Sequence, residues 1–174
     1  LRAAAAILPP EFRQLDAADS DISAMSATSI SLRTTQQFAF LCMAPELRAD
    51  GAIAVRVRQR PFFGVRGSFD AGDSVLLYDE GDPATRSDDD WVRGQIIAVS
   101  SGDCFDPDRT RPGYALILRL HWAADSRSDP RGLTNGSPLR GFAAVTYALY
   151  PSPADNKWYL GQRLEGGVIQ PLLG

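Results

Sequence analysis

The stretch that decides the fold spans residues 53–58 and reads IAVRVR. Apolar side chains stand at 53, 55 and 57, with Ala or Arg between them, which is the two-residue period of a β-strand. One buried face and one solvated face are typical of an antiparallel sheet. Residues 29–33, SISLR, alternate in the same way.

The sequence beyond residue 20 therefore predicts a sheet. Further strands are expected at Phe38–Met43, Ser74–Tyr78, Trp91–Ser100, Tyr114–His121, Phe142–Tyr150 and Trp158–Arg163. Clusters of Gly, Pro, Asp and Ser separate them, and the longest loops are expected at Asp79–Asp90, Gly102–Gly113 and Ala123–Arg140.

Before residue 20 the period changes to that of a helix. Five residues recur at steps of four and three and form one apolar stripe: Leu1, Ala5, Leu8, Phe12 and Leu15. Pro9 and Pro10 lack the amide donors of a continuous helix, so a kink is expected there. The fold class predicted is α+β, with a kinked amphipathic helix over residues 1–19 packed on a largely antiparallel sheet domain over residues 20–174.

Composition excludes some functions. The chain has 174 residues, 44% of them hydrophobic, and a net charge of −3, which is the wrong sign for a surface that tracks phosphates. The Arg-rich run VRVRQRPFFGVRG (55–67) is interpreted as a strand with an outward Arg face followed by a turn, and no nucleic acid is expected as a partner. No run approaches the roughly 18 apolar residues of a membrane span.

No motif in the sequence indicates catalysis, and we expect no enzyme. His121 is the only histidine, and its strand position beside Arg119, opposite Leu118, predicts a solvated surface. Most carboxylates fall in turns, where Asp caps backbone amides. A carboxylate-only glycosidase would need two facing carboxylates, and the sequence nominates no pair.

Calcium is the one cofactor that the sequence suggests. DCFDPD places Asp103, Asp106 and Asp108 in one expected loop, and Asp88–Asp90 lie in another. Several oxygens are what Ca²⁺ requires, although the spacing is not that of an EF-hand. The alternative is a solvated acidic loop.

The two cysteines, Cys42 and Cys104, are far apart in the chain. They fit either one structural disulfide or two buried free thiols, and the residues alone leave both open. Export to an oxidising compartment would favour the disulfide.

The order of features resembles the W-type minor pilins of type IV pili and the J-type minor pseudopilins of type II secretion. LRAAAAILPPEFRQL (1–15) resembles the exposed end of the long pilin helix, and DISAMSATSISLR (21–33) resembles the first head strands. Similar segments follow in order: FAFLC (38–42), GDSVLLYDEGDPATRSDDDWVRGQI (72–96), GYAL (113–116), VTYALYP (145–151) and KWYLGQRLEGGVIQPLLG (157–174).

This resemblance implies a structural subunit at or near a filament tip, where it primes assembly or contacts other pilin or pseudopilin subunits. The helix stripe would serve assembly. Localisation would be extracytoplasmic, with the full-length protein anchored in the inner membrane by an N-terminal helix or built into a filament. The family's cleavage motif, apolar segment and early Glu do not occur in the sequence, so we expect a fragment, trimmed at one or both ends.

Two alternatives remain. In the first, the chain is a self-contained α+β domain whose N-terminal helix covers its own sheet and joins no filament. An extracytoplasmic module that binds a small ligand or carbohydrate would use either Trp91, Trp122 and Trp158, clustered on one open face, or the acidic loops.

Overall fold

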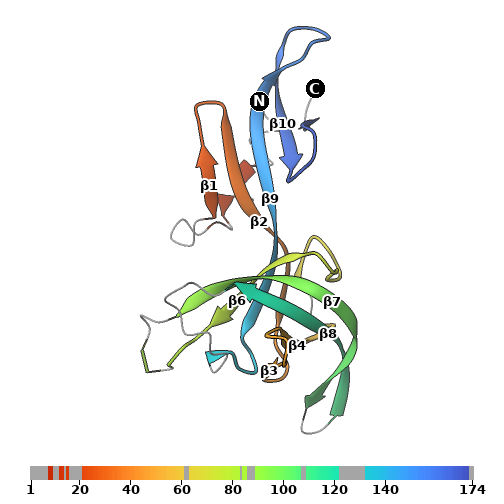
Figure 1. Ribbon diagram of the computed structural model, residues 1–174. Helices are drawn as coiled ribbons and strands as arrows, with labels where there is room; N and C mark the ends of the chain where they lie inside the picture. Colours follow the sequence, from red (N-terminus) through yellow and green to blue (C-terminus); the bar gives the residue numbers. More distant parts are fainter. Residues whose placement is uncertain are drawn as a thin grey trace. The chain divides into compact units, whose positions relative to one another are not determined.

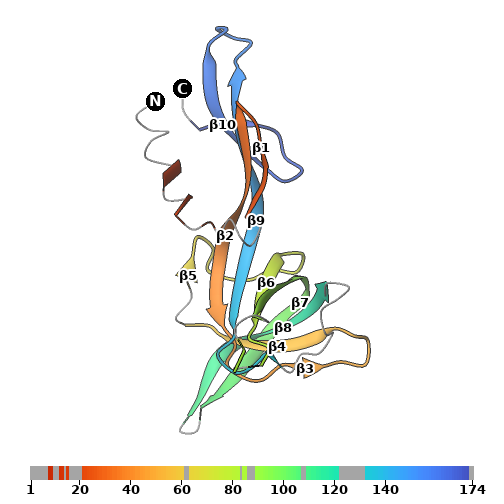
Figure 2. The same ribbon diagram turned by 90° about the vertical axis from the view of Figure 1, so that its left-hand side faces the viewer.

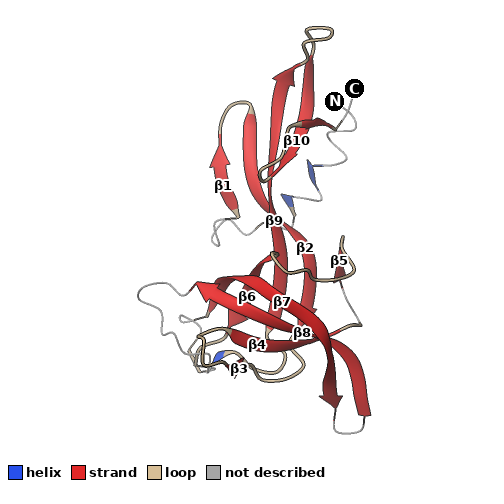
Figure 3. Ribbon diagram, turned by 45° about the vertical axis from the view of Figure 1, so that its right-hand side comes forward, coloured by secondary structure: helices blue, strands red, loops and turns tan. Residues whose placement is uncertain are grey.

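The fold is almost entirely antiparallel β-sheet. The computed structural model describes residues 8, 9, 12, 13, 15, 21–60, 63–82, 84, 85, 89–106, 109–121 and 132–172. Of these, 61% lie in strands and 3% are helical (Figure 3). The described strands are β1 (Ile22–Met25), β2 (Ser29–Phe40), β3 (Glu46–Leu47), β4 (Ile53–Arg58), β5 (Phe63–Gly64), β6 (Ser74–Asp79), β7 (Asp90–Asp106), β8 (Arg109–His121), β9 (Pro138–Pro151), β10 (Trp158–Leu164) and β11 (Gln170–Pro171).

The predicted α+β class is therefore wrong. Among the described N-terminal residues, the only α-helical positions are Leu8, Pro9 and Phe12. The amide of Arg13 donates to the carbonyl of Pro9 at 3.1 Å, and the amide of Leu15 donates to that of Phe12 at 3.3 Å. Pro9 and Pro10 donate no backbone hydrogen bonds, which weakens a helix at this point. The regular apolar stripe was therefore not enough to predict a packed helix. No helix in the described ranges is long and apolar enough to cross a membrane.

The chain forms two compact units. Unit 1 comprises Leu1–Thr34 and Ala143–Gly174, and unit 2 comprises Thr35–Phe142. Strands β2 and β9 each contribute residues to both units.

Unit 2 is a sheet that closes on itself. Its strands follow the order β2, β9, β6, β7, β8, β4 and β3 (Figure 1). Leu41, the residue after β2, forms a bridge with Val57 of β4, and the amide of Cys42 donates to the carbonyl of Arg56 at 2.8 Å. The last long strand is thus hydrogen-bonded to the end of the first, which removes an open edge.

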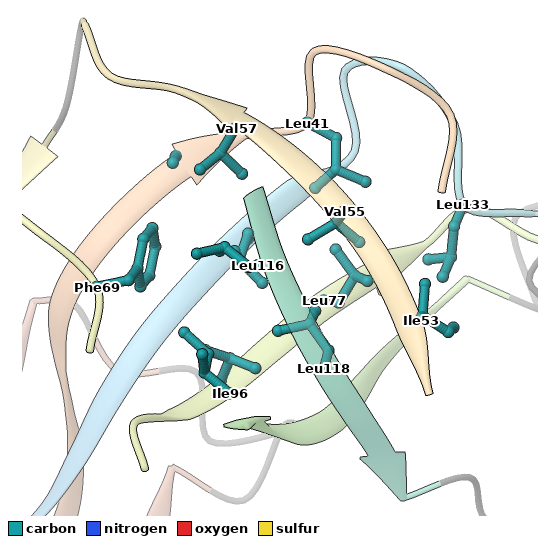
Figure 4. Close-up of a cluster of buried hydrophobic side chains, with 13 residues drawn as sticks. Leu41, Ile53, Val55, Val57, Phe69, Leu77, Ile96, Leu116, Leu118 and Leu133 are labelled. Atoms are coloured by element: carbon teal, nitrogen blue, oxygen red, sulfur yellow. The ribbon is translucent and has the colours of Figure 1, made fainter. Parts of the chain in front are cut away.

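The interior of unit 2 is filled by the alternate residues of its strands. Ile53, Val55 and Val57 of β4 are at most 1% exposed, which confirms the alternation read from the sequence. Their side chains meet those of Leu116 and Leu118 from β8 (Figure 4). The remaining buried members of this cluster are Ala39, Leu41, Phe69, Val75, Leu77, Ile96, Leu133 and Leu139.

A buried glutamine ties a loop to this closed sheet. Gln37 is 1% exposed, and its Nε2 donates to the carbonyl of Ser68 at 3.1 Å and to Asp73 Oδ2 at 3.2 Å. Arg66 Nη1 donates to Asp73 Oδ1 at 2.7 Å, and Arg66 also pairs with Asp70. The hydrogen bond to Asp73 raises the pKa of Arg66, against the opposing effect of burial. The network fixes the loop that carries Phe69 into the core.

The sequence located most strands and misjudged one loop. The predicted strand Ile53–Arg58 has the observed bounds of β4. The loop expected at Gly102–Gly113 is wrong, since β7 continues to Asp106 and β8 begins at Arg109. Gly102 pairs directly with Gly113 in this ladder, so these glycines lie within strands.

Replacing Gly141 by Ala should destabilise unit 2. A Cβ at Gly141 would collide with Oε1 of Gln37, whose side chain cannot withdraw without losing its hydrogen bonds, and would lie 3.2 Å from Phe69 Cε1. We expect a loss of about 1–3 kcal/mol in urea unfolding. Gly67→Ala is the control, because nothing lies within 4 Å of its Cβ position; equal effects of the two substitutions would contradict the packing argument.

Candidate assembly surface

Unit 1 is an open sheet whose two faces differ in polarity. Its strands follow the order β1, β2, β9, β10 and β11 (Figure 1). Figure 2 gives a second view of β1, β2, β9 and β10. Directly opposed residues of an antiparallel pair share a face, so the ladder assigns the faces. Ile22 opposes Leu32 and Met25 opposes Ile30 in β1 and β2, while Trp158 opposes Pro151 and Leu160 opposes Leu149 in β10 and β9.

These residues lie on one side, which we call the apolar face of unit 1. It consists of Ile22, Met25, Ile30, Leu32, Val145, Tyr147, Leu149, Pro151, Trp158, Leu160 and Leu164. Ser31 and Thr146 lie on the other side, where their hydroxyls are 2.8 Å apart and hydrogen-bonded.

Segments from both ends of the chain cover the centre of the apolar face. Leu8 and Leu15 pack against the buried cluster of Leu32, Val145 and Tyr147, as does Leu172. The amide of Leu172 also donates to the carbonyl of Leu160 at 3.0 Å. Two of the five predicted stripe residues thus contact the sheet. Phe12 is 41% exposed, and Leu1 and Ala5 lie outside the described residues.

The margins of the apolar face remain exposed in the described part of the chain. Met25 is 77% exposed, Trp158 65% and Leu149 47%. Large apolar side chains grouped on one face are typical of a site that binds another molecule. Sequence reasoning missed this surface because its strands come from residues 22–32 and 145–164, although the alternation within each strand was visible.

The hairpin tip that presents Trp158 is well ordered by hydrogen bonds. The amide of Ser152 donates to the carbonyl of Lys157, and that of Asn156 to the carbonyl of Ser152, both at 2.8 Å. Asn156 adopts a positive φ of 56°, which Asn tolerates better than most residues. Tyr159 Oη donates to Asp155 Oδ2 at 2.5 Å. These bonds define the backbone of the turn next to Trp158.

An open pocket of about 420 Å³ lies in unit 1 beside Ser31 and Thr146. Its polar side chains are Ser23, Ser31, Thr146, Arg163 and Glu165. Glu165 is the only carboxylate among the lining residues, so this pocket does not supply the facing pair of a glycosidase.

The disulfide between Cys42 and Cys104 is confirmed. The two residues are bonded, with their Cα atoms 5.6 Å apart, and they are 5% and 2% exposed. The bond lies beside the closure of unit 2, since Cys42 follows Leu41 and its bridge to Val57. Gly113 makes room for it: a Cβ there would lie 3.0 Å from Sγ of Cys104.

The structure does not bring the predicted calcium ligands together within its described part. Asp103 lies in β7, where its carbonyl accepts from Arg56 Nη1 at 3.2 Å. The side chain of Asp106 and all of Asp108 lie outside the described residues, as does Asp88. No group of three His, Cys, Asp or Glu in the described ranges has the arrangement of a metal site.

The remaining single-residue predictions are resolved in part. His121 is exposed while Leu118 is buried, as the strand alternation predicted. Trp91 belongs to unit 2, where its ring is 5.2 Å from that of Tyr78 in an edge-to-face contact, whereas Trp158 belongs to unit 1. Trp122 lies outside the described residues.

Comparisons with protein families, with curated proteins and with solved structures find no match to this chain.

Reducing the disulfide should strongly destabilise unit 2. The bond joins residues 62 positions apart, and the loop-closure entropy of such a crosslink is worth about 4 kcal/mol. We expect Cys42→Ser with Cys104→Ser to lower the free energy of urea unfolding by about this amount, and reductant to have no effect on the double variant. Two thiols that react freely in the untreated protein would contradict the bond.

The turn at Asp155 should shift the titration of Tyr159. The hydrogen bond to Asp155 raises the pKa of Tyr159 above its usual 10.0, and the same bond lowers the pKa of Asp155 below its usual 3.8. Its stabilising effect is therefore lost at low pH as Asp155 gains a proton, and at high pH as Tyr159 loses one. Phenolate absorbance, with Tyr159→Phe to assign the signal, should show a lower Tyr159 pKa in Asp155→Asn. An unchanged titration would contradict the contact.

Proposed function

We propose that this chain is a structural subunit of a pilus or pseudopilus, of the minor pilin or minor pseudopilin kind, which acts by assembling with other subunits. The observation that carries the proposal is the apolar face of unit 1. It takes up Leu8 and Leu15 from the N-terminal segment and continues past them to exposed Leu149 and Trp158. Burial of such area provides the main free energy of most protein associations.

The arrangement suits an N-terminal segment shared between a subunit and its neighbours. A short segment with one apolar stripe is unstable alone and needs a surface to pack on. Leu8 and Leu15 supply such a contact, and Phe12, between them, projects far enough to be 41% exposed. One side of the segment thus joins its own sheet while an aromatic side chain stays accessible to another subunit.

The disulfide supports an extracytoplasmic location for this function. Structural disulfides form and persist mainly in oxidising compartments, such as the periplasm and the cell surface. Cys42 lies in the segment FAFLC, one of the ordered features that resemble pilin-like heads. The partners proposed are other pilin or pseudopilin subunits, and the inner membrane through a segment encoded ahead of Leu1.

The parent gene provides the first test. The codons upstream of Leu1 should encode a short basic leader followed by about twenty apolar residues, the length of a membrane span, with a Glu near their start. A start codon or a cleavable secretory signal directly ahead of Leu1 would overturn the proposal.

Deletion of the gene tests the function itself. We expect loss of pilus assembly or of type II secretion in cells that carry it, with recovery when the gene is returned. Trp158→Ser should restore the phenotype poorly, because it removes an exposed anchor of the apolar face. Val168→Ser should restore it fully, because Val168 is 78% exposed but lies outside the strands of that face. Intact assembly and secretion in the deletion strain would contradict the proposal.

A further inference from the structure

Strand β1 forms an outer edge of the unit 1 sheet. It pairs with β2 on one side, and no described strand pairs with its other side (Figure 1). All four of its residues are exposed. The amide of Ser26 donates to the carbonyl of Ser29 at 2.8 Å, so the preceding residue, Met25, belongs to a pair whose backbone groups point away from β2. Its amide and carbonyl thus face the open side.

The edge lacks the charged residues and prolines by which many sheets prevent pairing with other chains. Natural edge strands carry charged residues, Lys above all, or Pro, whereas β1 reads ISAM. The preceding Asp21 offers no exposed charge, because its side chain is fully buried and Oδ1 lies 3.4 Å from Nε of Arg33. The turn after β1 is neutral as far as Ser29.

The bulge in β1 makes the strand complementary to itself. The register shifts between Ile22 and Ala24, so Ile22 and Met25 lie on the apolar face although they are three residues apart. In an antiparallel pair of two such strands, Ile22 of each copy lies opposite Met25 of the other, and Ser23 lies opposite Ala24. Apolar residues meet apolar residues at both ends.

We propose that β1 is a homotypic docking edge, which pairs antiparallel with β1 of a second copy of this chain about a two-fold axis between Ser23 and Ala24. Pairing makes the apolar faces of the two unit 1 sheets continuous and covers Met25, which is 77% exposed in the single chain. The contact is isologous and closes as a dimer. A second copy is the occupant that the register favours, because the bulge places Ile22 and Met25 on one face and two such strands oppose Ile22 of one to Met25 of the other.

Four residues per strand make a small interface. Contacts of this size fall among weak, transient interactions, so the expected behaviour is a concentration-dependent equilibrium between monomer and dimer. The pairing goes beyond the proposed function and is measured on the isolated chain, so its failure leaves the pilus proposal to the gene tests above.

Sedimentation of the purified chain from about 1 µM to about 1 mM, the range of weak dissociation constants, should show a growing dimer fraction. Hydrogen exchange at Ile22–Met25 should slow by about ten-fold as the dimer fraction rises. Met25→Pro removes an outward amide that β2 does not use and should raise the dimer dissociation constant by about ten-fold or more. Met25→Leu retains both the amide and the apolar side chain and should dimerise normally.

Met25→Lys provides a second disruptive variant in case the proline variant fails to fold, because it puts a charge on the edge and leaves the backbone unchanged. Loss of the dimer in a folded Pro or Lys variant, with retention in Met25→Leu, supports the proposal. A chain that stays monomeric at about 1 mM, or a dimer that both variants leave unaffected, overturns it.

Discussion

Closure of the unit 2 sheet is the constraint on which the rest of that unit depends. The bridge between Leu41 and Val57 joins the end of β2 to β4, and the bond between Cys42 and Cys104 fixes the same seam to β7. Gly113 is required there, because a Cβ would lie 2.6 Å from the carbonyl oxygen of Val57. Closure turns the alternate apolar residues of the long strands inward, so one ring of strands supplies both walls of the core.

Unit 1 faces the opposite physical situation. Its sheet is open, so it retains an edge at β1 and an apolar face that the described ends of the chain cover only at the centre, through Leu8, Leu15 and Leu172. An open sheet gains less from its own burial than a closed one, and the uncovered part stays available to partners. The two units thus differ in their use of apolar area: unit 2 buries it in a closed core, and unit 1 leaves part of it exposed.

The sequence predicted those features of the fold that depend on neighbours along the chain. Alternation located β4 to the residue and put Leu118 inside and His121 outside, because a strand's two faces follow from its period. The disulfide was one of two open alternatives, since its geometry depends on closure. The helix prediction was wrong because it gave the apolar stripe of residues 1–15 more weight than the helix-breaking effect of Pro9 and Pro10. The loop prediction for Gly102–Gly113 was wrong because it took the glycines as turn residues, whereas Gly102 lies in a strand where a Cβ would be only 3.0 Å from that of Ala115.

The candidate surface was beyond sequence reasoning for a related reason. Its residues are correctly patterned within each strand, but only pairing shows that β1, β2, β9 and β10 turn their apolar sides the same way. Ile22 and Met25 would have been assigned to opposite faces by a strict two-residue period, and the bulge reverses that assignment. The irregularity has a chemical consequence: in a regular strand Ile22 and Met25 would lie on opposite faces and could not oppose each other in a symmetric pair, whereas the bulged strand places both on one face and matches apolar with apolar. The feature least visible in the sequence is therefore the one that makes the edge of unit 1 selective for its own copy.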